Sequence, residues 1–199
     1  GIQAIGALTF GTETIQKVDK IFGPGNQYVT AAKQVAQNFG VAIDMPAGPS
    51  EVAIVADMTC HPEYVAADML SQAEHGMDSQ SILFTDNEEV ARAVLAEVEK
   101  QLEALPRKEM ASSSLGHSRI VVLHDMEEAF EICNQYAPEH LILAMDTALD
   151  WADRVVNAGS VFLGHYSCES AGDYASGTNH TLPTSGYAKA YSGVNLDSF

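Results

Sequence analysis

Short runs of apolar, β-branched residues alternate along the chain with longer segments whose apolar residues recur at helical spacing. The runs are four or five residues long, as buried strands are, and lie at 52–56, 81–85, 119–123, 141–144 and 160–163. The longer segments predict helices at about 62–75, 87–104, 126–136 and 148–157. This alternation predicts an α/β fold with a mostly parallel, doubly wound sheet that helices cover on both faces.

A front section precedes the alternation. Residues 20–22 are expected to lead through the loop Gly23-Pro24-Gly25-Asn26 into a helix at about 27–38. The loop at 45–50 has two prolines and a glycine, which predicts a domain boundary near residue 49. The chain starts without a methionine, apparently inside a helix, and stops without a closing helix, so we expect a piece of a longer protein.

The charge balance narrows the classes of partner. Ten basic and 27 acidic residues give a net charge of −17 at pH 7, which argues against binding to nucleic acid or to an anionic membrane surface. No apolar run approaches the roughly 20 residues that cross a bilayer. The three cysteines form no C-x-x-C pair, as is usual in a reducing compartment. We therefore expect a soluble, cytoplasmic protein.

The loop Gly23-Pro24-Gly25-Asn26 could hold an anion, because it precedes a predicted helix whose N–H groups face it. It lacks the third glycine of the G-x-G-x-x-G fingerprint, however, and Pro24 removes an N–H donor. An ordinary turn explains this loop better than a nucleotide site does.

Gln72 and His75 lie three positions apart at the end of the predicted helix 62–75, so their side chains can converge on one point. A histidine near a helix C-terminus is also favourable for the helix dipole alone, and glutamine is an uncommon zinc ligand. The spacing by itself therefore favours a structural role over metal binding.

Glu139 and His140 stand side by side just before the strand at 141–144. A carboxylate and an imidazole together can move protons near neutral pH. A polar loop entering a buried strand is the competing interpretation, and ligands of open parallel sheets usually bind at the other, carboxyl ends of the strands.

The segment 170–184 is rich in small polar residues and follows the last predicted strand. We expect it to be a loop without regular structure at the carboxyl edge of the sheet, and loops of this length are often functional. Asp173 and His180 within it can offer an oxygen and a nitrogen to a metal or a substrate.

Taken in order, six segments of the chain resemble the histidinol dehydrogenase family: KVDKIFGPGN, AIDMPAGPSE, LSQAEHGMDSQ, NQYAPEHL, AGSVFLG and SAGDYASGTNHTLPT. No single segment is decisive, but the set with its spacing is specific and runs through essentially the whole chain. The resemblance implies a four-electron oxidation of L-histidinol to L-histidine through the aldehyde. It implies two NAD⁺ per turnover and a zinc ion that holds the amine and imidazole of the substrate.

The resemblance also implies roles for individual residues. The zinc ligands would be Gln72, His75 and Asp173, and the family's fourth ligand, a histidine from the C-terminal domain of the partner subunit, has no match in this chain. His140 would take the alcohol proton, and Glu139 would activate the water that hydrates the aldehyde. The expected substrate contacts are Ser50, Gln72, His75, His140, Asp173 and His180, the last as a supporting or proton-relaying residue, and the expected NAD contacts are Gln3 and Asn26.

The family fold consists of two Rossmann-like domains in a homodimer with a shared active site. Residues 1–49 would then be the latter part of the NAD-side domain, residues 50–195 the latter part of the catalytic domain, and residues 196–199 the start of a C-terminal tail. Two alternatives remain: an inactive fragment that keeps partial zinc and NAD sites, and a zinc-dependent hydrolase built on the same histidine, aspartate and glutamate residues.

Overall fold

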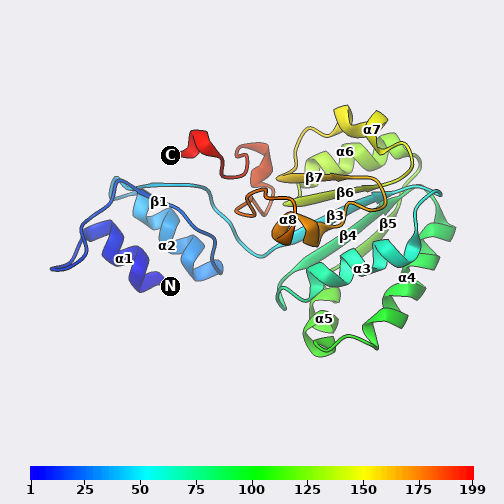
Figure 1. The fold of residues 1–199 in the computed structure, drawn as a ribbon, viewed down its shortest axis with the longest axis horizontal. Helices are drawn as coiled ribbons and strands as arrows, with labels where there is room; N and C mark the ends of the chain where they lie inside the picture. Colours follow the sequence, from blue (N-terminus) through cyan, green and yellow to red (C-terminus); the bar gives the residue numbers. More distant parts are fainter.

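The computed structural model describes residues 1–199 as a small N-terminal α/β unit beside a larger unit with a five-stranded sheet (Figure 1). All strands of this sheet are parallel, and their order is β5-β4-β3-β6-β7. The strands are β3 (Glu51–Ala56), β4 (Gln80–Thr85), β5 (Arg119–Val122), β6 (His140–Ala144) and β7 (Ser160–Leu163). The predicted parallel sheet is confirmed, and each strand lies within one residue of its predicted bounds.

Helices cover both faces of the sheet. α3 (Pro62–Ala73), α4 (Glu88–Leu102) and α5 (Lys108–Leu115) lie on one face, and α6 (Met126–Tyr136) and α7 (Ala148–Trp151) lie on the other (Figure 1). Since successive strand residues point to opposite faces, Ile54 packs with Met69 of α3, whereas its neighbour Val55 packs with Phe130 of α6. The doubly wound arrangement is confirmed.

The predicted helix at 148–157 is shorter than expected. α7 stops at Trp151, a 3₁₀ turn follows at Ala152–Arg154, and the chain is extended at Val155. The side chain of Asn134 on α6 accepts hydrogen bonds from the backbone N–H groups of Val156 and Asn157, at 2.8 and 3.2 Å. These N–H groups are therefore satisfied without a further helical turn.

The expectation of a loop throughout 170–184 is wrong at its start. α8 (Glu169–Tyr174) occupies this part, and the chain then returns to the amino edge of the sheet instead of remaining at the carboxyl edge. There the Thr184 hydroxyl oxygen accepts a hydrogen bond at 2.5 Å from the N–H of Gly48, which lies just before β3. The segment that follows the last strand thus meets the residues that precede the first strand of the large sheet.

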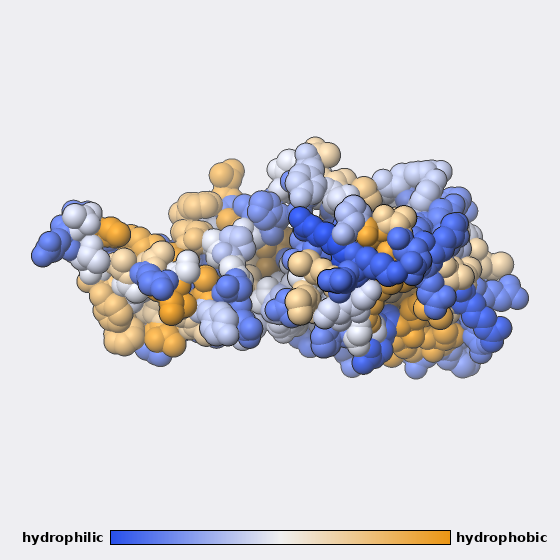
Figure 2. Space-filling view, turned by 90° about the horizontal axis from the view of Figure 1, so that it is seen from below, coloured by the Kyte–Doolittle hydropathy of each residue, from blue (hydrophilic) through white to orange (hydrophobic).

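The small unit consists of α1 (Ile2–Phe10), β1 (Lys20–Ile21), α2 (Gln27–Gln37) and β2 (Ala42–Ile43), with β1 and β2 parallel. Its core is small and comprises Ile5, Ile21, Ala36 and Val41. Several large apolar side chains remain exposed on its two helices, and Figure 2 shows hydrophobic residues gathered on this part of the surface.

The C-terminal segment folds back onto the small unit (Figure 1). Phe199 stacks on Phe22 with 4.5 Å between ring centroids, and Val194 packs with Met45 and Ala47. All three cysteines are free thiols, as expected. None of the helices is long and apolar enough to cross a membrane.

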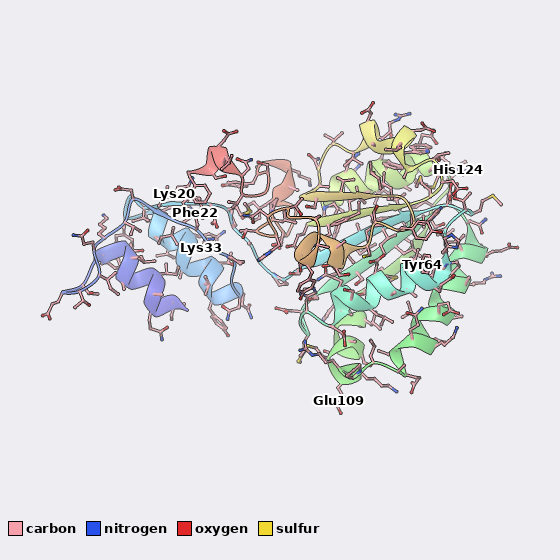
Figure 3. The ribbon with its side chains drawn as sticks, in the orientation of Figure 1. Lys20, Phe22, Lys33, Tyr64, Glu109 and His124 are labelled. Carbon is pink, nitrogen blue, oxygen red and sulfur yellow. The ribbon has the colours of Figure 1, made fainter.

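A buried ion pair anchors the loop Gly23–Asn26. Lys33 of α2, which Figure 3 labels near Lys20 and Phe22, is 1% exposed and binds the carboxylate of Asp44. Its ammonium group also donates to the Gly23 carbonyl oxygen at 2.8 Å, and Asp44 accepts from the Gly23 N–H at 2.7 Å. The backbone N–H and carbonyl oxygen of Gly23 thereby fix the loop to the end of β2.

Replacing Lys33 by methionine leaves the Asp44 carboxylate buried without its counter-charge. Breaking a buried pair from one side costs about 3–5 kcal/mol. We therefore expect Lys33→Met to lower the urea midpoint and to speed hydrogen exchange in residues 20–44, and the double variant Lys33→Met/Asp44→Asn to recover part of the loss. A single variant as stable as the unmodified chain would refute this role of the pair.

Candidate functional site

A cleft of about 430 Å³ lies between the two units, at the amino ends of β3 and β6. It brings together six of the residues that the sequence singles out, from five separate segments: Ser50, His75, Glu139, His140, Asp173 and His180. Pro24 and Gly25 of the small unit complete one wall. The cleft is thus at the end of the sheet opposite to the one that parallel sheets usually use.

Glu139 and His140 are held against the backbone of β3. The Glu51 N–H donates to Glu139 Oε2 at 2.9 Å, and His140 Nδ1 lies 3.2 Å from the Glu51 carbonyl oxygen. A carbonyl oxygen can only accept, so Nδ1 carries the proton and Nε2 is the unprotonated nitrogen of the neutral ring. The arrangement leaves the imidazole ready to accept a proton at Nε2.

Burial sets the proton affinity of both side chains. Glu139 is 6% exposed and His140 is 5% exposed. Desolvation raises the pKa of Glu139 to about 8, with the nearby Glu51 carboxylate adding to the effect, and lowers the pKa of His140 below its usual value. His140 is therefore neutral at pH 7, whereas Glu139 is a carboxyl group whose ionisation falls within the working range of a general base.

Gly159 lets two segments approach closely behind this pair. Its N–H donates to the Pro138 carbonyl oxygen at 3.0 Å, and a Cβ at this position would lie 2.5 Å from the Glu139 carbonyl oxygen. Any side chain here would displace the backbone of Glu139. The glycine before β7 is thus part of what positions the carboxyl group.

His75, Asp173 and a residue that the sequence analysis missed, Glu169, form a second cluster beside the pair. The donor atoms of these three side chains lie within 4.8 Å of one another. Glu169 and Asp173 are four residues apart on α8, so they share one helical face toward His75, which follows the end of α3. Recognising α8 as a helix would have revealed Glu169, but its six residues, with a glycine among them, give no clear helical pattern.

The charges in this second cluster stabilise one another. Hydrogen bonding to Glu169 raises the pKa of His75. Burial alone would raise the pKa of Glu169, but His75, His140 and Ser71 together hold it below the usual value.

Gln72 is fully buried, and neither its amide oxygen nor its amide nitrogen has a hydrogen-bond partner. One oxygen of Glu169 is likewise buried and unpartnered. Leaving a buried polar group unpaired costs about 1–3 kcal/mol, so such groups fit a site that binds a ligand. Imidazole nitrogen with carboxylate and amide oxygens is a donor set that accepts a divalent metal such as zinc.

The two expected NAD contacts do not line the cleft. Gln3 is exposed on α1. Asn26 caps α2 by accepting hydrogen bonds from the N–H groups of Tyr28 and Val29, both at 3.2 Å. Its neighbour Gly25 is the small-unit residue that reaches the cleft.

Comparisons with known proteins identify one family. The chain matches the family model described as histidinol dehydrogenase over residues 1–199. It is 62% identical over 199 residues to a histidinol dehydrogenase of Bacteroides thetaiotaomicron and 60% identical over 202 residues to a chloroplastic histidinol dehydrogenase of Oryza sativa subsp. japonica. These alignments cover 100% of this chain and 46% and 43% of the two relatives.

A solved structure of the same family is also similar to this chain. The crystal structure of histidinol dehydrogenase from Elizabethkingia anophelis superimposes with a TM-score of 0.96 at 68% identity, covering 100% of this chain and 46% of that one. The chain thus spans about half the length of the relatives it matches.

The raised pKa of Glu139 predicts a pH-dependent stability. Its folded pKa of about 8 exceeds the unfolded value of 4.5, so the folded state binds the extra proton between these values and loses stability as the pH rises from 4.5 to 8. Between pH 5 and pH 8 the free energy of unfolding should fall by on the order of 3 kcal/mol more in the unmodified chain than in Glu139→Gln, which has no carboxyl group to titrate. Urea unfolding at the two pH values measures this difference.

Glu131→Gln, an exposed substitution on α6, is the matched control and should follow the unmodified chain. Parallel pH profiles for Glu139→Gln and the unmodified chain would show that Glu139 is not perturbed by burial.

Proposed function

The chain belongs to the histidinol dehydrogenase family, and from this premise we propose that its cleft carries out the oxidation of L-histidinol to L-histidine with NAD⁺ and zinc. The observation that carries the proposal is the convergence of Glu139 and His140 with His75 and Asp173 on one cleft between two α/β units. This convergence joins a proton-transfer pair to a metal-binding donor set, as a metal-assisted alcohol oxidation requires.

Gln72, His75 and Asp173 are the residues that would hold the zinc ion. When bound, the zinc ion would hold the substrate as a Lewis acid, and NAD⁺ would take up the hydride of each of the two oxidations. Ser50 and His180 line the same cleft, and we assign both of them to substrate contact. We assign Gln3 and Asn26 to the NAD side as expectations from the family resemblance alone.

His140 acts in both oxidations. Its unprotonated Nε2 accepts the proton of the substrate hydroxyl while the carbinol carbon loses its hydride, and the C–O bond becomes the aldehyde C=O. The Nδ1–H donated to the Glu51 carbonyl oxygen fixes the ring during this transfer. In the second oxidation the same nitrogen, unprotonated again after the hydration, accepts a hydroxyl proton of the hydrated aldehyde while its carbon loses the second hydride. The resulting carboxylic acid loses its remaining proton to solvent and leaves as the carboxylate.

Glu139 acts between the two oxidations. Its ionised carboxylate takes a proton from water as the water oxygen bonds to the aldehyde carbon. The protonated Nε2 of His140 returns its proton to the former carbonyl oxygen, which gives the hydrate that the second oxidation consumes, and Glu139 then releases its proton to solvent. The Glu51 N–H that donates to Glu139 Oε2 orients the carboxyl group for this step. Because the group must be ionised, its raised pKa predicts that hydration speeds up as the pH rises toward about 8.

The wider setting is also part of the proposal. Residues 1–49 would belong to the NAD-side domain, residues 50–195 to the catalytic domain, and residues 196–199 to the start of a C-terminal tail. A homodimer that shares its active site would supply the fourth zinc ligand, which the family resemblance places on the partner subunit. The free thiols suit the cytoplasm, although one relative is named as chloroplastic, so a plastid is a second possible setting.

Formation of NADH from L-histidinol in the presence of zinc tests the proposed function directly. We expect His140→Ala to reduce kcat by about 10²–10⁴-fold, the usual contribution of a positioned general base. His61→Ala is the matched control, since His61 precedes α3 at the carboxyl end of the sheet, and it should retain the activity.

Zinc and histidinol binding without any NADH would favour the inactive fragment, and Glu139-dependent hydrolysis without nicotinamide would favour the hydrolase. Either result would overturn the proposed function.

Measuring the two half-reactions separately tests the division of roles. Glu139→Gln cannot take a proton from water, so we expect it to slow oxidation of the aldehyde more than oxidation of histidinol. Equal losses in both half-reactions would contradict a water-activating role for Glu139.

A further inference from the structure

The side chain of Glu51 is buried beside Glu139 and His140 and takes no part in the steps described above. Glu51 is the first residue of β3 and is 8% exposed. One carboxyl oxygen, Oε1, accepts a hydrogen bond from the Ser185 N–H at 2.7 Å, and the other, Oε2, is buried without a partner. Burial of such a group costs free energy, so packing alone does not explain a carboxyl group at this position.

The segment that ends just before Ser185 forms one wall of the cleft. His180, Leu182 and Thr184 all line the cleft. Alternate residues of an extended chain point to the same side, so this wall segment, residues 180–184, presents one face to the bound substrate. Ser185 follows directly, and a contact that holds Ser185 therefore fixes the end of the wall.

The backbone of Ser185 has an unusual conformation. Its φ is 56°, in the left-handed region that residues other than glycine seldom adopt. Gly48 packs closely against this turn, since a Cβ on Gly48 would lie 3.3 Å from Thr184 Oγ1 and 3.4 Å from Ser185 Oγ. Strained positions persist where the surrounding contacts fix them, and they are concentrated at functional sites.

We propose that the Glu51 side chain is a positioning residue, which holds Ser185 so that the wall segment faces Glu139 and His140 across the cleft. The inference rests on the proposed function, because the substrate of that function binds against this wall. One residue then aligns both parts of the site. The backbone N–H and carbonyl oxygen of Glu51 orient the proton-transfer pair, and its carboxyl group holds the wall segment.

The other hydrogen bonds of residues 180–185 do not reach the large sheet. The Val194 N–H donates to the Thr181 carbonyl oxygen at 3.1 Å, which ties the wall segment to the C-terminal segment. The Gly48 N–H donates to Thr184 Oγ1, which ties it to the linker at 45–50. Only the bond to Glu51 joins the wall segment to a strand of the sheet that carries the proton-transfer pair.

Steady-state kinetics of the zinc-loaded protein test the inference. A wall that is no longer held binds histidinol less well, so we expect Glu51→Ala to raise KM for histidinol about tenfold or more, as the loss of one strong hydrogen bond does. A purely structural loss would lower the folded fraction and the apparent kcat but leave KM unchanged. Glu51→Gln keeps an oxygen that can accept from the Ser185 N–H, and it should restore KM to near the unmodified value.

Gln80→Ala is the matched control. Gln80 begins β4 directly opposite Glu51, and its side chain donates to the His117 carbonyl oxygen at 2.8 Å instead of contacting the wall segment. This variant should leave KM unchanged. If Glu51→Ala does not fold, Glu51→Asp keeps the charge, shortens the side chain by one carbon and should show the same rise in KM.

Hydrogen exchange of residues 180–186 gives a second measurement, which needs no activity. We expect the Ser185 amide to exchange faster in Glu51→Ala than in the unmodified protein, and at a near-normal rate in Glu51→Gln. An unchanged KM in Glu51→Ala, unchanged exchange at Ser185, or an equal rise of KM in Gln80→Ala would overturn the inference, while NADH formed by the unmodified protein would leave the proposed function standing. Absence of NADH from the unmodified protein would overturn both.

Discussion

The parallel pairing of β3 with β6 is the constraint on which the site depends. In this register Val52 of β3 lies opposite His140, the first residue of β6. Glu51, which precedes Val52, therefore presents its backbone N–H and carbonyl groups to Glu139 and His140. One N–H orients the carboxyl group of Glu139, and one carbonyl oxygen fixes the ring of His140. If the pairing of β6 with β3 shifted by one residue, each of these two side chains would point to the other face of the sheet. The positions of the Glu139 carboxyl group and the His140 ring are therefore set by backbone pairing as well as by side-chain packing.

The cleft forms at the amino ends of the strands because other segments build walls there. The linker at 45–50 and the segment after α8 meet through the hydrogen bond between Gly48 and Thr184, and the loop anchored by Lys33 closes the other side. Burial by these walls removes water from Glu139 and His140, which raises the pKa of Glu139 and lowers the pKa of His140. The packing that forms the cleft thus also sets the proton affinity of Glu139 and His140.

Much of this arrangement could be predicted from the sequence. Continuous apolar runs identified every strand of the large sheet, because strands buried on both faces carry such runs. The same patterns failed for α5, whose three consecutive serines give no apolar stripe, and for α8, which is too short to show one. Glu169 was missed for that second reason. The place of Glu139 before a strand argued against function only because the path of the chain after β7 could not be foreseen.

Nitrogen-15 NMR of the histidine rings tests most directly whether this cleft is the site of histidinol chemistry. The structure predicts a neutral His140 with the proton on Nδ1 at pH 7, and ring signals of His75 and His140 that move when zinc and then histidinol are added. The exposed His124, which Figure 3 labels far from the cleft, should not respond. A His140 ring protonated at Nε2, or signals that ignore both additions, would contradict the assignment.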